Sequence, residues 1–410
     1  MLKRIPANRL VPGMHLHKLC GKWLEHPFWR TNFRLDDAGD IRLVVESGVR
    51  EVWIDTARGL DVAGDTPNDT PPAPDVPASP LPVATAVARP APVATTIDVE
   101  YGQAKALCKK AASAVKSLHT EARLGNALDV ENCLPLVDEI SDSLLRNAQA
   151  LISVSRLKLR DEYTYMHSVA VCALMVALGR RLGLDPDLVR EAGLAGLLHD
   201  MGKARMPLDV LNKPGQLTDD EFAVIRSHPE QGHALLVESG IVVPGVLDVC
   251  LHHHEKIDGR GYPHRLKHAE ISLLARMGAV CDVYDAITSN RPYKSGWEPG
   301  LSLHRMAQWQ GHFDPFVFQS FVKTVGIYPT GSLVRLHSGR LAVVTEQNPA
   351  RLTAPQVRVF YSIRSQMQLV PETIDLAASG CRDKISGGES PEAWGFTDLE
   401  SLWSGTSAAT

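Results

Sequence analysis

The sequence lacks the usual signs of a disulfide-rich, secreted or membrane-spanning protein. Its seven cysteines are scattered and include no C-x-x-C pair, which argues against a disulfide framework and favours a reducing compartment. The longest apolar run, residues 169–178, is about half the ~20 residues that a membrane span needs, so it predicts a buried helix. The opening Met-Leu-Lys-Arg-Ile-Pro is not followed by the apolar core of a secretory signal. We therefore expect a cytoplasmic protein without membrane insertion.

An excess of charge of one sign is also missing. The chain has 43 Lys and Arg residues against 47 Asp and Glu residues, a formal net charge of −4. Binding to duplex nucleic acid usually requires a broad basic surface, so we do not expect it as the main activity. Local basic side chains that bind a small anion remain compatible with this composition.

Composition and periodicity change along the 410 residues, which are enough for two or three domains. The first part contains strand-like segments such as residues 49–54. Nine of the 27 prolines then lie between Pro67 and Pro92, which indicates an extended linker. Helical spacing of apolar residues follows up to about residue 325, and strand-like segments return at 333–337 and 356–361.

The predicted fold class is therefore mainly α, with a small β-rich unit on either side of a helical bundle. Asp185-Pro186 and the capping box from Thr218 to Glu221 mark two helix starts within it. The helices of residues 98–158 either form a homo-oligomer contact or pack on the bundle. The expected divisions are a β-rich N-terminal domain (1–63), a Pro/Ala-rich linker (64–96), a helical connecting segment (97–154), a catalytic helical domain (155–328), a small β unit (329–378) and a flexible tail (379–410).

Histidine is concentrated in one part of the chain. Nine of the 16 histidines lie between His167 and His268. Imidazole and carboxylate ligands together suit Fe, Mn, Zn or Ni, whereas a thiolate site would show clustered cysteines. A lone histidine on an apolar helix, such as His167, is more often an ordinary packed residue, so only the whole set indicates a metal site.

A carboxylate beside a histidine at a helix end, as in His199-Asp200, offers chemistry that imidazole alone does not. Its two oxygens can bridge two ions, and two ions ~3.5–4 Å apart hold a hydroxide nucleophile and a phosphoryl group for in-line attack. Metal ions also lower the pKa of bound water toward ~7. Asp282 and Asp285 are three residues apart and share a helix face, so only one of them need be a ligand.

Together, these motifs resemble the HD-GYP family, a branch of the HD superfamily of metal-dependent phosphohydrolases. The resemblance covers about residues 155–325 and rests on His199-Asp200-x-Gly-Lys203, His228 with Gly232, His253-His254-Glu-x-x-Asp258-Gly-x-Gly261-Tyr262-Pro263, Asp282-x-x-Asp285-Ala and Arg291-Pro-Tyr-Lys294. The N-terminal segment is similar to a small domain of unknown function that often precedes HD-GYP domains in bacteria. The resemblance implies a helical HD bundle that hydrolyses cyclic di-GMP to 5′-pGpG through a metal-bridging hydroxide, and it leaves open a second cut to GMP.

The resemblance also implies roles for single residues. One of two divalent ions, Fe(II) or Mn(II), would be held by His167, His199, Asp200 and Asp282, and the other by Asp200, His228, His253 and His254. Lys203 would lie beside the scissile phosphate and act with Asp200 in catalysis, while Arg291 and Lys294 would contact phosphate and guanine of the substrate. The fixed distance to Gly261-Tyr262-Pro263 selects the second and third of the three consecutive histidines and leaves His252 outside.

One position departs from the family pattern. Some members carry a glutamate four residues before the first histidine, where it supports a third ion, and this chain has Tyr163 there. Glu162 is one residue away, and one step along a helix turns a side chain by about 100°. We therefore expect two ions rather than three.

Several alternatives stay open at this point. The Gly261-Tyr262-Pro263 segment is either a rigid exposed turn or, as the family suggests, a docking loop for GGDEF-domain proteins, and the two are compatible. The same ligand set would serve an HD-type phosphohydrolase of another cyclic dinucleotide, or a non-catalytic scaffold that binds cyclic di-GMP or GGDEF domains. The N-terminal domain either regulates the catalytic domain or recruits a partner.

Overall fold

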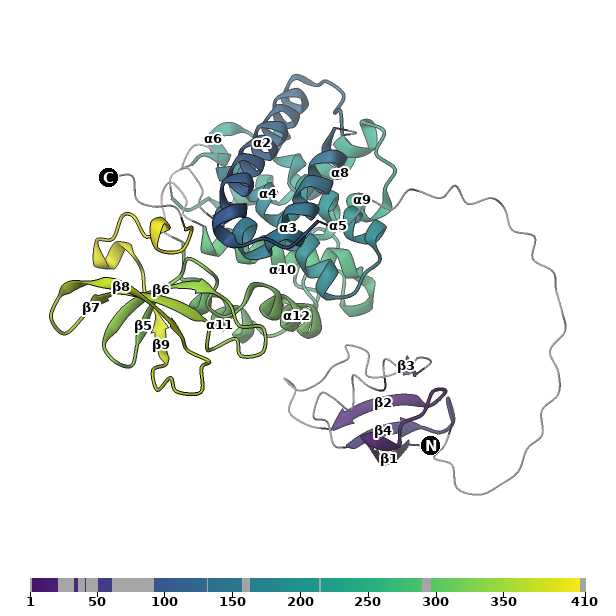
Figure 1. Ribbon diagram of the computed structural model, residues 1–410. Coiled ribbons are helices and arrows are strands. Elements are labelled where there is room, and N and C mark those ends of the chain that lie inside the picture. Colours follow the sequence, from purple (N-terminus) through teal and green to yellow (C-terminus); the bar gives the residue numbers. More distant parts are fainter. Residues whose placement is uncertain are drawn as a thin grey trace, which may run out of the picture. The chain divides into compact units, whose positions relative to one another are not determined.

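The computed structural model describes residues 2–20, 33–35, 41, 51–60, 92–130, 132–156, 163–213, 215–289 and 296–405. The chain divides into two compact units, residues 1–88 and 89–410, each of which is described by itself (Figure 1). None of the helices in these described ranges is both long and apolar enough to span a membrane.

The first unit contains a four-stranded antiparallel sheet in the order β1-β4-β2-β3. Its strands are β1 (Leu2–Pro6), β2 (His15–Cys20), β3 (Phe33–Arg34) and β4 (Glu51–Asp55). The strand predicted at residues 49–54 corresponds to β4, where Val52 and Ile54 alternate with partly exposed neighbours and enter a small core with Leu16. Residues 42–50, which precede it, lie outside the described residues.

The second unit begins with a helical bundle, followed by a sheet beside α11 (Figure 1). The helices are α2 (Ile97–Leu124), α3 (Cys133–Arg156), α4 (Tyr163–Arg181), α5 (Pro186–Leu198), η4 (Met201–Arg205), α6 (Leu208–Leu211), α7 (Asp219–Arg226), α8 (His228–Glu238), α9 (Pro244–His252), η5 (His268–Glu270), α10 (Leu273–Thr288), α11 (Pro299–Gln308) and α12 (Pro315–Val325). The two expected helix starts are confirmed, because Asp185 accepts a hydrogen bond from the Leu188 amide and Thr218 forms a full capping box with Glu221.

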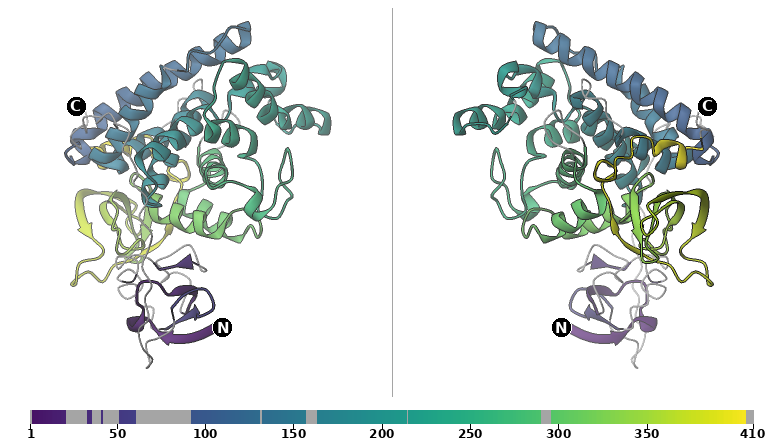
Figure 2. Two further views of the ribbon diagram at one scale, coloured as in Figure 1. Left: turned by 90° about the vertical axis from the view of Figure 1, so that its right-hand side faces the viewer. Right: turned by 90° about the vertical axis from the view of Figure 1, so that its left-hand side faces the viewer.

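Helix α4 lies at the centre of the bundle and carries the longest apolar run of the sequence. Almost every side chain from Val169 to Leu178 is buried, as expected for a helix that is apolar on all sides. Helices α2 and α3, from the segment predicted to connect two domains, share the core of α4 through residues such as Val115 and Ile140. Figure 2 shows α2 along the outer side of this bundle.

The C-terminal sheet has five antiparallel strands in the order β8-β7-β6-β5-β9. They are β5 (Leu333–Leu336), β6 (Arg340–Glu346), β7 (Gln356–Ser362), β8 (Met367–Asp375) and β9 (Ile385–Gly388). The two segments predicted as strands correspond to β5 and β7, and residues such as Val334, Val344 and Val357 form a core of their own.

The expectation of a flexible tail from residue 379 is wrong for residues 379–405. Strand β9 pairs with β5, and Trp403 is buried with its ring 5.3 Å from that of Tyr101 on α2. Glu400 accepts a hydrogen bond from the Tyr101 hydroxyl. The prediction followed the Ser/Gly/Thr-rich composition and gave no weight to single aromatic residues. One buried tryptophan can order a segment of otherwise polar sequence.

Candidate metal centre and active site

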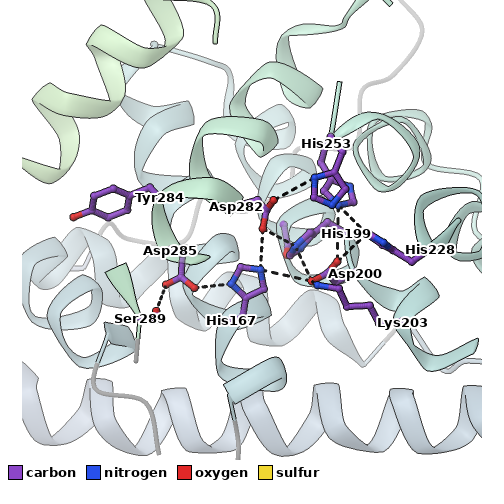
Figure 3. A network of polar contacts seen from close by, with 12 residues as sticks. His167, His199, Asp200, Lys203, His228, His253, Asp282, Tyr284, Asp285 and Ser289 are labelled. Atoms are coloured by element: carbon purple, nitrogen blue, oxygen red, sulfur yellow. Dashed lines mark hydrogen bonds and ion pairs between the residues drawn. The ribbon is translucent and has the colours of Figure 1, made fainter. Parts of the chain in front are cut away.

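The seven predicted metal ligands come from five helices and converge in the bundle interior (Figure 3). Six of their side chains are almost fully buried, and only the His254 side chain is partly exposed, at 22%. The ligands lie on α4 (His167), at the end of α5 (His199, Asp200), at the start of α8 (His228), at the end of α9 (His253, His254) and on α10 (Asp282). The two predicted substrate contacts, Arg291 and Lys294, lie outside the described residues.

Asp200 lies between two pairs of imidazoles. Its Oδ2 atom is 3.3 Å from Nε2 of His199 and 3.6 Å from Nε2 of His167. Its Oδ1 atom is 3.3 Å from Nε2 of His228 and 3.8 Å from Nε2 of His253. Each oxygen therefore faces a different pair of nitrogens, the arrangement expected of a carboxylate that bridges two ions.

Helix ends orient three of these histidines. Carbonyls of the last helical turn, several of which lack an amide partner within the helix, here accept hydrogen bonds from ring Nδ1–H groups. This fixes the tautomer and leaves each Nε2 lone pair directed at the centre. The three pairs are His199 with the Gly196 carbonyl (2.8 Å), His228 with that of Ile225 (2.7 Å) and His253 with that of Val249 (3.0 Å).

His167 lies within α4 rather than at a helix end, and a carboxylate orients it instead. Its Nδ1 is 2.6 Å from Oδ2 of Asp285, and its Nε2 is 3.0 Å from Oδ1 of Asp282. The two aspartates of α10 therefore have different roles. Asp282 points into the centre, whereas Asp285 lies behind His167 and is held in turn by Ser289 Oγ at 3.4 Å.

Replacement of Asp285 by Asn is expected to weaken metal binding by about 10- to 100-fold, because a histidine ligand loses its charged outer partner. Titration with metal-buffered solutions measures this directly. Asp138→Asn, which breaks a surface ion pair with Arg190, is the matched control and should bind metal like the wild type. Unchanged affinity in Asp285→Asn would contradict the orienting role.

The donor set fits divalent ions. Among the described residues, Asp200 Oδ1 and His199 Nε2 are buried and have no hydrogen-bond partner, a state that costs about 1–3 kcal/mol per group unless something else satisfies it. In each of three residue groups, the donor atoms all lie within 4.8 Å of one another. The groups are His167/His199/Asp282, His228/His253/His254 and His199/Asp200/His253. Imidazole with carboxylate is a ligand set for Fe, Mn, Zn or Ni.

The electrostatics keep the carboxylates ionised. Burial opposes the charged form of Asp200, but the Lys203 ammonium and the His199 ring outweigh burial and hold the pKa of Asp200 well below its usual range. Burial also opposes ionisation of Asp282, and the hydrogen bond with His167 holds the pKa of Asp282 well below the ordinary carboxyl value. Both side chains are therefore ligand-competent anions at neutral pH.

Two of the histidines are held neutral by the same environment. Burial lowers the pKa of His253 well below its ordinary value and lowers the pKa of His254 to about 3. Each ring therefore offers a free lone pair at neutral pH, which is the form that binds a metal ion.

The comparisons with known proteins agree with this centre. Residues 143–317 match the family described as "HD domain", and residues 2–133 match a domain of unknown function (DUF3391). The chain is 53% identical over 411 aligned positions to the "Cyclic di-GMP phosphodiesterase PA4108" of Pseudomonas aeruginosa, covering 100% of this chain and 97% of that protein. The chain belongs to the HD-GYP family.

Other relatives match a smaller share of the chain. The "Cyclic di-GMP phosphodiesterase response regulator RpfG" of Xanthomonas campestris is 40% identical over 172 residues, 40% of this chain and 45% of that protein. The "3'3'-cGAMP-specific phosphodiesterase 1" of Vibrio cholerae is 32% identical over 179 residues, 42% of this chain and 41% of that protein.

The HD-GYP lysine lies at the edge of this centre. Lys203 Nζ is 2.5 Å from Asp200 Oδ2, and its side chain is 25% exposed. Its backbone is held by α2, because Arg123 donates hydrogen bonds to the carbonyls of Lys203 and Met206 at 3.2 and 3.3 Å. Lys203 and His254 are the most accessible side chains of the set and mark the opening of the site.

The Gly-Tyr-Pro segment packs directly against the metal centre. The Tyr262 ring stacks on His254 with centroids 4.7 Å apart. A Cβ atom on Gly261 would lie 2.4 Å from the Lys256 amide nitrogen, so glycine is required there. The buried Glu255 carboxylate accepts hydrogen bonds from the amides of His264 and Leu266 at 2.7 and 3.1 Å and holds the rest of the turn.

Sequence reasoning did not find the contact of Tyr262 with His254, although both residues belong to one motif. The residues between them form turns and irregular backbone rather than a helix or strand, so no regular periodicity could indicate the contact. Asp285 had a recognisable signal, its spacing of three residues from Asp282 on one helix face. Tyr163 is the first residue of α4, and no carboxylate therefore occupies the position one helical turn before His167.

Proposed function

We propose that the chain is a metal-dependent phosphodiesterase that hydrolyses cyclic di-GMP to 5′-pGpG. The observation that carries the proposal is Asp200, whose two oxygens each face a pair of imidazole nitrogens at 3.3–3.8 Å. The names of the Pseudomonas and Xanthomonas relatives support the choice of substrate. The alternatives of a scaffold without activity and of a different dinucleotide substrate are outcomes of the test below.

The proposed ligands form two sets that share one carboxylate. His167, His199 and Asp282 with one Asp200 oxygen would hold one ion, and His228, His253 and His254 with the other oxygen would hold the second. Divalent ions held in this way supply Lewis-acid activation of water and of the phosphoryl group. Fe(II) and Mn(II) are our proposed ions, because both accept mixed nitrogen and carboxylate ligands.

The side chains of the protein complete the reaction. Hydrolysis adds the oxygen of water to phosphorus and breaks the bond to the 3′ oxygen, which leaves with a proton. The Lys203 ammonium, at the opening and beside Asp200, is placed to stabilise the negative charge that develops on this leaving oxygen and to donate the proton. Arg291 and Lys294 are proposed, from the motif alone, to bind phosphate and guanine.

The product is proposed to be mainly 5′-pGpG. No carboxylate is present at position 163 to support a third ion, so we expect two ions and a slow second cut to GMP. A cytoplasmic location is proposed as well. Six cysteines, Cys108, Cys133, Cys172, Cys250, Cys281 and Cys381, are free thiols, which suits a reducing compartment.

Docking of GGDEF-domain proteins at Gly261-Tyr262-Pro263 is a further proposal, taken from the family resemblance. Tyr262 contacts His254, so a partner bound to this loop would act close to a metal ligand. The prediction is that a purified GGDEF domain changes the rate of cyclic di-GMP hydrolysis by the wild type. An unchanged rate at saturating GGDEF domain would contradict it.

The proposed activity is tested by an anaerobic turnover assay with protein reconstituted with Mn(II) or Fe(II). Cyclic di-GMP and 3′3′-cGAMP are supplied separately, and products are resolved by chromatography. We expect 5′-pGpG to accumulate, with kcat/KM for cyclic di-GMP at least ~10-fold above that for 3′3′-cGAMP. Folded, metal-loaded protein that turns over neither nucleotide would favour a scaffold, a preference for 3′3′-cGAMP would overturn the substrate, and rapid release of GMP would contradict the two-ion centre.

A further inference from the structure

Arg226, at the end of α7, carries a positive charge that lies over aromatic rings beside the centre. Its guanidinium carbon lies 4.8 Å from the ring centroid of Tyr262 and 5.8 Å from that of Phe222. Neighbouring cations are paired, Lys203 with Asp200 and Arg205 with Glu238. Within the described parts of the chain, Arg226 has neither an ion pair nor a side-chain hydrogen bond.

The location of Arg226 relates it to the opening of the site. Tyr262, over which Arg226 lies, stacks on His254, and the His254 side chain, at 22% exposed, is the most accessible of the proposed ligands. Two residues further along the chain, His228 begins α8 and faces Asp200. The guanidinium therefore lies on the accessible side of the site, separated from the proposed ligand His254 by the Tyr262 ring.

The chemistry of the proposed substrate fits a positive charge at such a place. A cyclic dinucleotide has two phosphodiesters, and when one lies at the metal centre the other must lie away from it. The protein carries a formal net charge of −4, so a local positive charge favours binding of the second anionic group. The planar guanidinium fork matches two oxygens of a phosphate.

We propose that Arg226 binds the phosphodiester of cyclic di-GMP that is not being cleaved, and that the Tyr262 ring holds the guanidinium in position by a cation–π contact. This inference rests on the proposed function and adds a binding residue to it. The site would then have two functions. The metal ligands and Lys203 act on the scissile phosphate, whereas Arg226 binds the other phosphate of the cyclic dinucleotide.

Arg226→Met tests the inference, because it removes the charge and keeps a flexible apolar stem. We expect KM for cyclic di-GMP to rise by about 10- to 100-fold, the range for a lost charge-assisted hydrogen bond, with kcat nearly unchanged. Hydrolysis of bis(p-nitrophenyl) phosphate, which has a single phosphodiester, should stay at the wild-type rate. Arg226→Lys should give an intermediate KM, since it keeps a point charge without the planar fork.

Arg260→Met is the matched control. Arg260 directly precedes Gly261, its side chain is 86% exposed, and its contact with Asp258 is long, at 3.9 Å. This control should leave both substrates unaffected. A wild-type KM in Arg226→Met would overturn this inference but not the proposed function. Equal loss of activity toward both substrates, together with loss of bound metal, would also overturn this inference alone, because it indicates a structural role for Arg226. Wild-type protein that hydrolyses bis(p-nitrophenyl) phosphate but neither binds nor cleaves cyclic di-GMP would overturn the proposed function and this inference together.

Discussion

Asp200→Asn is expected to lower cyclic di-GMP turnover by ~10³-fold and to leave the protein unable to retain two ions. Removal of a single preorganised electrostatic contact already costs ~10²–10³ in rate, and Asp200 contacts both halves of the centre. An amide keeps the shape of the side chain but loses its charge, and its nitrogen cannot act as a ligand. Turnover and metal content of the same dialysed sample measure the two effects.

The comparison with Asp285→Asn sharpens this expectation. Asp285 orients one ligand from outside the centre, so its loss should weaken binding without preventing it, whereas the loss of Asp200 affects both ions at once. Full metal content in Asp200→Asn, or equal effects of the two substitutions, would contradict the bridging role of Asp200.

Gly202→Ala is expected to destabilise the protein by about 3 kcal/mol, at the upper end of overpacking effects, and to remove activity. A Cβ atom at this position would lie 1.8 Å from the His228 carbonyl oxygen and 2.6 Å from the Gly232 amide nitrogen. Both are backbone atoms, so η4 and α8 must separate to admit the methyl group. His228 would move with α8, and urea unfolding together with metal analysis measures both consequences.

Gly102→Ala in α2 is the control for that substitution. A Cβ atom at Gly102 meets nothing within 4 Å, and a glycine inside a helix costs about 0.5–1 kcal/mol relative to alanine. This variant should therefore be slightly more stable than the wild type and fully active. If Gly202→Ala unfolded with the same urea midpoint as the wild type, this would contradict the close approach of η4 and α8.

Local signals in the sequence predicted the helical bundle well, whereas the resemblance to the HD-GYP family supplied the predicted ligands, which the structure brings close together. Apolar residues on every face of residues 169–178 indicated a buried helix, and α4 is buried at the centre. Asp185 and Thr218 marked helix starts because a cap depends on neighbours within one turn. Five of the ligands lie at or beside a helix end, where short-range geometry fixes the direction of the side chain. His167 and Asp282 instead lie within α4 and α10 and meet through the packing of these two helices.

The remaining features depend on contacts between distant segments, which no local periodicity encodes. Strand β9 pairs with β5 across about fifty residues, and Trp403 packs on Tyr101 across about three hundred. To predict which of Asp282 and Asp285 points into the centre, one must know the orientation of α10 about its own axis relative to α4. The contacts of Tyr262 with His254 and Arg226 required the path of the loop that carries it.

The most direct test of the two-ion centre is a titration of metal-free protein with Mn(II) under anaerobic conditions. Bound Mn(II) and the initial rate of cyclic di-GMP hydrolysis are measured at each addition. A two-ion centre predicts low activity after the first equivalent, a steep rise with the second, and a plateau at two ions per chain. Full activity at one ion, or a requirement for a third, would contradict it.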